Sequence, residues 1–96
     1  MFEWDREKAA ANLLKHGVSF EQALTVFADA TAIDGPDIKH SKAEQRRFLV
    51  GQAADGQILG VTYTLRSGTH GEAVRIITAR RASRKERRAY QAAAAD

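Results

Sequence analysis

Basic residues crowd one short segment of this 96-residue sequence. The segment from Arg75 to Arg88 holds seven basic residues against the single acid Glu86, a net charge of +6, whereas the rest of the chain sums to −3. Such a concentration of cations is typical of a protein that binds a polyanion, either a nucleic acid or an acidic protein surface. A solvated basic helix explains the same charge equally well, so charge alone leaves both interpretations open.

The predicted position of these cations favours phosphate binding. Ser83 and Glu86 have the spacing of a capping box, which predicts a helix that continues through Tyr90. Cations in the first turn of a helix are disfavoured by the helix dipole, so stability alone would not place them there. Together with Arg80 and Arg81 at the end of the preceding strand, they predict a phosphate site, with solubility as the weaker explanation.

Metal-independent cleavage of an RNA phosphodiester needs a base near the 2′-hydroxyl, an acid for the 5′-oxygen and cations for the crowded transition state. The sequence offers three candidate cations on or just beyond one strand: Arg75, Arg80 and Arg81. Candidates for the base or acid are His40, Glu44 and Tyr90. A histidine beside a loop is more often a solvent-exposed residue than a catalyst, but imidazole is the easiest general base at neutral pH.

The remaining aromatic and histidine residues have simpler explanations. His16, at the end of a predicted helix, is explained as a favourable carboxyl-terminal cation. His70, in a predicted turn, is incidental. Trp4 and Tyr63 are expected in the core, because a single tryptophan beside a helix start usually packs.

Alternation along the strand predicted over residues 74–81 separates the three arginines. Arg75 and Arg81 fall on one face, while Arg80 falls on the other unless a bulge intervenes. At least one of the three is expected to pair with Glu44 or Glu72 for structural reasons.

Local signals predict the elements that hold these residues. Asp5 caps a helix that stops at Gly17, and Ser19 with Gln22 forms a capping box for a second helix. Phe2 to Trp4 form a short edge strand, and residues 29–43 form a loop with at most a short strand near residues 31–33. The Asp55-Gly56 turn and period-two alternation predict an antiparallel meander with strands over residues 47–53, 58–66 and 74–81.

The predicted fold is of the α+β class and has two layers. Two amino-terminal helices pack on the antiparallel meander, and a carboxyl-terminal helix follows it. The helices cover one face of the sheet and leave the other, with its threonines and arginines, to a ligand. With 44% apolar residues, the chain is expected to form a single domain over residues 1–96, with a tail that frays near residues 91–96.

Composition narrows the chemistry and the location. No apolar run approaches the roughly 18 residues that cross a bilayer, and the opening residues 1–8 carry acids where a secretory signal needs cations, so a cytoplasmic protein is expected. The sequence has no cysteine, and its three histidines are widely scattered. We therefore expect neither a metal nor another cofactor.

Three blocks of the sequence resemble one protein family, the BrnT toxins. The carboxyl-terminal block runs from Arg75 to Ser83 and continues with Glu86-Arg87 and Tyr90, and the middle block comprises His40-Ser41, Glu44, Arg47-Phe48 and Gly51. The amino-terminal block consists of Phe2-Glu3-Trp4-Asp5, Lys8-Ala9, Asn12, the run from Lys15 to Glu21, Ala23 and Val26-Phe27. The outer blocks are specific, and the three cover nearly the whole chain. Arg6 departs from the common pattern, in which many members have proline, and this affects only a helix start.

The resemblance implies both an activity and a partner. It implies a RelE-like fold, a ribonuclease that arrests translation, and a BrnA-type antitoxin that carries a ribbon-helix-helix DNA-binding domain. Toxin and antitoxin would together repress their own promoter, so operator DNA would be reached only through the complex. By the same resemblance, the site residues are first Glu44, Arg80 and Arg81, with Arg75, His40 and Lys15 behind them. Further RNA contacts are expected from Arg66, Arg84, Lys85, Arg88 and Tyr90.

Two other interpretations use the same basic surface. In the first, the protein is a non-catalytic RNA-, DNA- or protein-binding module whose arginines only hold phosphates. In the second, the basic tail is a docking surface for an acidic antitoxin, which is compatible with a ribonuclease because covering the active surface would inhibit it. Loss of phosphate contacts would change affinity and its salt dependence, whereas loss of a catalytic group would abolish cleavage with binding partly retained.

Overall fold

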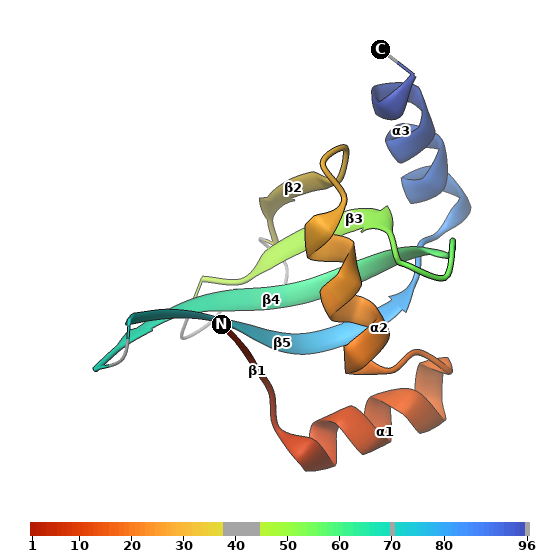
Figure 1. The fold of residues 1–96 in the computed structure, drawn as a ribbon. Helices are drawn as coiled ribbons and strands as arrows, with labels where there is room; N and C mark the ends of the chain where they lie inside the picture. Colours follow the sequence, from red (N-terminus) through yellow and green to blue (C-terminus); the bar gives the residue numbers. More distant parts are fainter. Residues whose placement is uncertain (38–44, 70, 96) are drawn as a thin grey trace.

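The computed structural model describes residues 1–37, 45–69 and 71–95, which form a five-stranded sheet and its flanking helices (Figure 1). The strands are β1 (Phe2–Glu3), β2 (Ile33–Pro36), β3 (Arg47–Gln52), β4 (Ile58–Gly68) and β5 (Gly71–Arg81). They lie in the order β1-β5-β4-β3-β2, with β1 parallel to β5 and the other neighbours antiparallel. The helices are α1 (Arg6–His16), α2 (Phe20–Leu24), the 3-10 helix η1 (Thr25–Ala28) and α3 (Arg84–Ala94).

The α+β class is as predicted, but the arrangement of elements differs from the prediction. Strands β3, β4 and β5 form the expected meander, yet the sheet is mixed because β1 adds to β5 in parallel and β2 adds to β3. Of the two predicted amino-terminal helices, only α1 is long, since α2 tightens into η1 after five residues. The Thr25 hydroxyl donates to the Gln22 carbonyl at 2.7 Å and accepts from the Ala54 N–H at 2.9 Å, a side-chain to backbone pattern that competes with regular helix.

The helix ends are those that the sequence predicts. The Asp5 carboxylate accepts from the N–H groups of Glu7 and Lys8, and Gly17 ends α1 in the left-handed region with φ 69°. Reciprocal capping boxes start α2 at Ser19 and α3 at Ser83. These contacts lie within a few residues of each other in sequence, which is why local pattern was sufficient to find them.

The main core lies between the sheet and the segment formed by α2 and η1. Trp4 and Tyr63 both belong to this region, as predicted: Trp4 packs edge-on against Phe20 with ring centroids 5.9 Å apart, and Tyr63 packs against Phe27 at 5.0 Å. The largest fully buried side chains are Phe20, Leu59, Ile76, Val18, Val26 and Val61.

The opposite face of the sheet is not left entirely open, contrary to the prediction. Helix α3 packs over its end nearest β3, where Val50, Ala82 and Tyr90 form a second cluster with Phe48 and Ile58 beside it. We call the remainder of this face, around Thr62, Thr78 and Arg80, the open face. Helix α3 therefore borders the open face instead of extending the layer of α1 and α2 (Figure 1).

A register shift between β4 and β5 reassigns the arginines. Thr62 pairs with Thr78 but the next residue, Tyr63, pairs with Ile76, so Ile77 is an extra residue on β5. Arg80, opposite Gly60, and Arg75, opposite Thr64, consequently lie on the same face of the sheet. The prediction for a strand without a bulge placed Arg75 and Arg81 on one face and Arg80 on the other. It is wrong because one inserted residue reverses the alternation.

Asn12 fastens α1 to the edge of β5. Its Nδ2 donates to the carbonyl of Ala79 at 2.8 Å and to that of Val18 at 2.9 Å, and its Oδ1 accepts from the Ala79 N–H at 3.1 Å. Strand β1 pairs with β5 only at Val74 and Arg75, so the Asn12 amide takes the place of a neighbouring strand farther along this edge. The side chain is buried, and its hydrogen bonds satisfy backbone groups that would otherwise be costly to bury.

We predict that Asn12→Ala lowers the free energy of unfolding by about 3 kcal/mol, because it removes the partners of buried backbone groups at Ala79 and Val18. Urea unfolding at neutral pH measures the loss. Leu14→Ala is the matched control on the same helix, since Leu14 is 91% exposed and its truncation removes little packing. A change of less than about 0.5 kcal/mol in Asn12→Ala would contradict this role.

Candidate functional site

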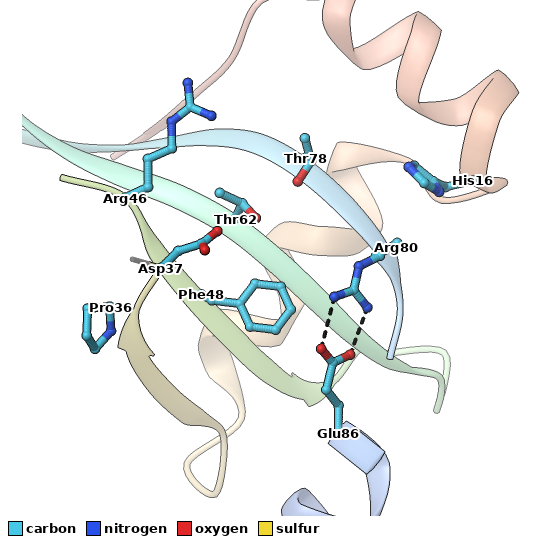
Figure 2. A pocket seen from close by; sticks show the side chains of 9 residues that line it. All are labelled: His16, Pro36, Asp37, Arg46, Phe48, Thr62, Thr78, Arg80 and Glu86. Atoms are coloured by element: carbon cyan, nitrogen blue, oxygen red, sulfur yellow. Dashed lines mark hydrogen bonds and ion pairs between the residues drawn. The ribbon is translucent and has the colours of Figure 1, made fainter. Parts of the chain in front are cut away.

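A pocket of about 510 Å³ lies on the open face, bordered by elements from all parts of the fold (Figure 2). Its floor is a row of cross-strand neighbours, in which Phe48 on β3 pairs with Thr62 on β4, and Thr62 pairs with Thr78 on β5. The next row toward α3 places Gly60 beside Arg80. The lining residues are His16, Pro36, Asp37, Arg46, Phe48, Thr62, Thr78, Arg80 and Glu86.

Arg80 is held in this pocket by the first turn of α3. Its Nη1 donates to Glu86 Oε1 at 2.7 Å and its Nη2 donates to Glu86 Oε2 at 2.9 Å. The same carboxylate accepts from the Ser83 N–H at 2.8 Å, so one side chain closes the capping box and fixes the guanidinium. The hydrogen bonds from Arg80, against a smaller effect of burial, lower the pKa of Glu86 to about 2.

An aromatic ring supports the guanidinium from the side of β3. The Cζ atom of Arg80 lies 5.1 Å from the centroid of the Phe48 ring, within the range of a cation–π contact. The ring passes over Gly60, where a Cβ atom would come within 2.5 Å of Phe48 Cζ. A glycine at this strand position is therefore what allows Phe48 and Arg80 to lie together.

The structure separates the residues that the sequence proposed as catalytic. Arg80 lines the pocket. Arg75 lies on the same face and donates to Glu3 Oε2 at 2.9 Å, an ion pair with β1 that the sequence did not predict. Arg81 pairs with the fully buried Leu59 and so lies on the other face of the sheet from Arg80. His40 and Glu44 lie outside the described residues.

The residues proposed to contact RNA are also dispersed. Lys15 is exposed on the last turn of α1, Arg66 is exposed near the far end of β4, and three cations are exposed on α3: Arg84, Lys85 and Arg88. Tyr90 is the exception and corrects the prediction, because it is only 7% exposed and its hydroxyl donates to Asp29 Oδ2 at 2.6 Å. Its position gives it a structural role, anchoring α3 to the segment after η1.

Sequence reasoning missed most of the pocket. The sequence explains His16 as a helix-end cation, and the threonines that it predicts on the open sheet face are not resolved to Thr62 or its partners. Local pattern places Phe48 in a strand and in the family's middle block, places Asp37 in a loop, and does not single out Arg46. These residues come from four separate segments, and no local signal states which strands become neighbours or where a helix docks.

The pocket combines charge of both signs with hydroxyl groups. Arg46 and Arg80 contribute cations, and Asp37 and Glu86 contribute carboxylates. Hydrogen bonding to Glu86 is the main effect that raises the pKa of Arg80, and the charge of Asp37 raises it further. Among the described residues, no three histidine, aspartate or glutamate side chains are grouped so as to hold a metal ion. Within the same part of the chain, no helix is long and apolar enough to cross a membrane.

The fold and the pocket together define a small α+β protein with an arginine-centred site on an open sheet face. The family described as "Ribonuclease toxin, BrnT, of type II toxin-antitoxin system" matches residues 4–86. The crystal structure of the Brucella abortus ribonuclease toxin BrnT, at 1.1 Å resolution, is similar, with a TM-score of 0.64 and 28% sequence identity over 88% of this chain and 99% of that chain. Among curated proteins, no significant match was found.

The chain belongs to the BrnT family of ribonuclease toxins from type II toxin–antitoxin systems. The family resemblance seen in the three sequence blocks is thus confirmed, and membership implies an antitoxin partner. The pocket described above contains Arg80, one of the arginines that the sequence also selected.

The Arg80–Glu86 pair predicts a specific pH dependence of stability. The pKa of Glu86 is lower in the folded chain than in the unfolded one, so the pair stabilises the fold above about pH 4.5 and this contribution is lost as pH falls toward 2. Because both side chains are partly exposed, we expect Glu86→Gln to cost about 1 to 2 kcal/mol at pH 7, a difference that shrinks steadily below about pH 5. Urea unfolding across this range measures it. Glu72→Gln, at an exposed carboxylate of β5, is the control. If the free energy of unfolding of Glu86→Gln changed with pH in parallel with that of the wild type, the coupling would be refuted.

The close approach of Phe48 to β4 predicts that Gly60→Ala destabilises the fold by about 1 to 3 kcal/mol through overpacking. Gly35→Ala is the matched control, because Gly35 is the cross-strand partner of Phe48 on β2 but has open space around its Cβ position. Chemical denaturation of both variants gives the comparison. If the Phe48 ring is the cause, adding Phe48→Leu to Gly60→Ala will recover part of the loss, whereas strictly additive effects would point to another cause.

Proposed function

We propose that this protein is a toxin that cleaves RNA in the open-face pocket without a metal ion, with Arg80 stabilising the charge that develops on the phosphate. The observation that carries the proposal is the fixed orientation of Arg80, whose guanidinium donates two hydrogen bonds to Glu86 and makes a cation–π contact with Phe48. A guanidinium that is already oriented stabilises a transition state better than one that must be ordered during the reaction.

The hydrogen-bonding capacity of Arg80 is sufficient for this role. A guanidinium has five N–H donors in a planar fork, and the end-on pair with Glu86 uses one on each Nη atom. Nη1 also donates to the Arg81 carbonyl at 3.2 Å, which leaves Nε and the second N–H of Nη2. Further donors on the same group are suited to a phosphate oxygen, for which arginine has the matching geometry. Glu86 then acts as a positioning residue that keeps the plane of the fork constant while RNA binds and leaves.

The neighbouring side chains suit a single-stranded RNA. The ring of Phe48 is partly exposed and offers a surface for a base, and Thr62 and Thr78 offer hydroxyl groups along the floor. The exposed cations of α3 and Lys15 lie outside the pocket, where they would attract flanking phosphates. Arg81 is not included in this site, because it faces away from Arg80.

For the partner, we propose a BrnA-like antitoxin with a ribbon-helix-helix domain that neutralises the toxin in the cytoplasm, the complex repressing its own promoter. Membership of a toxin–antitoxin family supports an antitoxin, and the residue-level resemblance supports its type. We further propose that the antitoxin covers Arg80. A structure of the complex in which Arg80 remains exposed to solvent would be incompatible with this mode of inhibition.

The activity is tested by incubating ribosome-free total RNA with the purified chain, freed from any co-expressed antitoxin, in the presence of a chelator. We expect Arg80→Ala to lower the cleavage rate at least about 100-fold, the loss typical of removing one transition-state donor. Arg81→Ala is the matched control, because it removes an identical charge from the adjacent position on the opposite face and is expected to leave cleavage near the wild-type rate.

The possible results separate the functional classes. RNA that stays intact with a correctly folded wild-type chain would refute metal- and ribosome-independent cleavage, and an in vitro translation assay would then test for a ribosome-dependent toxin. RNA binding without cleavage in either assay would indicate the non-catalytic module. Equal loss of cleavage in Arg80→Ala and Arg81→Ala would show that net charge, and not the oriented fork, is what the reaction requires.

A further inference from the structure

The carboxyl end of α1 lies at the pocket, because the helix docks on the edge of β5. Asn12 is bonded to the backbone of Ala79, whose neighbours on β5 are the pocket residues Thr78 and Arg80. His16 follows Asn12 by four residues, so it lies one turn farther along the same side of α1. The hydrogen bonds of Asn12 therefore set the distance between the helix end and the pocket.

The chain is also fixed just after His16. Gly17 closes the helix in the left-handed conformation, and its N–H donates to the Leu13 carbonyl at 2.8 Å. The next residue, Val18, is fully buried, and its carbonyl accepts from Asn12 at 2.9 Å. With the backbone held on both sides, the imidazole of His16 is directed from the helix end toward Thr78 and Arg80 (Figure 2).

Of the other charged groups that line the described pocket, two guanidinium groups and one carboxylate are poorly suited to accept a proton at neutral pH. Arg80 and Arg46 are guanidinium groups, which stay protonated. Glu86 is held ionised by Arg80, with its pKa lowered to about 2, and Asp37 is a second carboxylate on the far side of the pocket. Lys15 is exposed on the same helix as His16 and does not line the pocket. Imidazole is the side chain whose chemistry suits general base catalysis near neutrality.

We propose that His16 is the general base of RNA cleavage, an inference that rests on the function proposed above. The neutral imidazole accepts the proton of the 2′-hydroxyl, and the 2′-oxygen forms a bond to phosphorus. The bond from phosphorus to the 5′-oxygen breaks, and that oxygen takes a proton from water, whose hydroxide restores neutral imidazole. The products are a 2′,3′-cyclic phosphate and a 5′-hydroxyl end, and Asn12 is the positioning residue that brings the base to the pocket.

The test compares wild type, His16→Gln and the control His70→Gln in single-turnover cleavage of an end-labelled pool of random RNA oligonucleotides, in chelator, from pH 5 to 9. The wild-type and His70→Gln rates are expected to rise with pH where imidazole loses its proton and then level off. His16→Gln is expected to be at least about 100-fold slower at pH 7.5 and to lack this rise, the effect expected from loss of a general base. Its affinity for the RNA, measured by filter binding, is expected to stay within about threefold of the wild type, since binding relies mainly on cations.

A second variant keeps the proposal testable if His16→Gln is impaired for structural reasons. Free imidazole added to His16→Ala is expected to restore part of the rate, which a misfolded chain would not allow. The proposal is overturned if His16→Gln cleaves at the wild-type rate, or if His40→Gln, and not His16→Gln, abolishes the rise with pH. These results differ from failure of the proposed function, in which the wild-type chain itself does not cleave RNA.

Discussion

The hydrogen bonds between the Asn12 amide and the backbone of Ala79 connect the two halves of this structure. On one side they dock α1, so that Val18 and Phe20 enter the core as the chain leaves the helix. On the other side they occupy the free edge of β5 directly between Thr78 and Arg80. An edge strand with unpaired backbone groups must be covered or paired, and one buried amide does this here while also bringing a helix end to the pocket.

At the start of α3, one side chain likewise serves two purposes. The carboxylate of Glu86 satisfies a helix-end N–H and holds the guanidinium of Arg80, so helix capping and site geometry depend on the same side chain. The middle of α3 is held independently by Tyr90, whose hydroxyl is one of the groups that hold the Asp29 carboxylate ionised. Burial opposes that ionisation, but hydrogen bonds from the Gln52 N–H and from Tyr90 outweigh it and keep the pKa of Asp29 well below its ordinary range. The wall of the pocket is thus a helix fixed at two points.

The extra residue in β5 decides which chemistry the sheet can present. Without it, Arg80 would lie on the core side and Arg81 on the open face, and neither the Phe48 contact nor the Glu86 pair could form as observed. A bulge has no reliable signature in a run such as Arg75 to Arg81, because every residue type there is compatible with either alternation. This is why the sequence placed Arg80 and Arg81 on opposite faces but could not decide which of the two lies on the open face.

The sequence by itself determined the features that depend on neighbours along the chain: the caps at Asp5, Ser19 and Ser83, the stop at Gly17, the three strands of the meander, and the family. These were predictable because the hydrogen bonds concerned span only a few residues. The tertiary structure alone decided the parallel pairing of β1, the face of each arginine, the burial of Tyr90 and the arrival of His16 at the pocket. Each of these depends on contacts between segments distant in sequence, such as the 67 residues that separate Asn12 from Ala79. Such contacts stabilise the fold only once the whole sheet has assembled, so they leave no local pattern in the sequence.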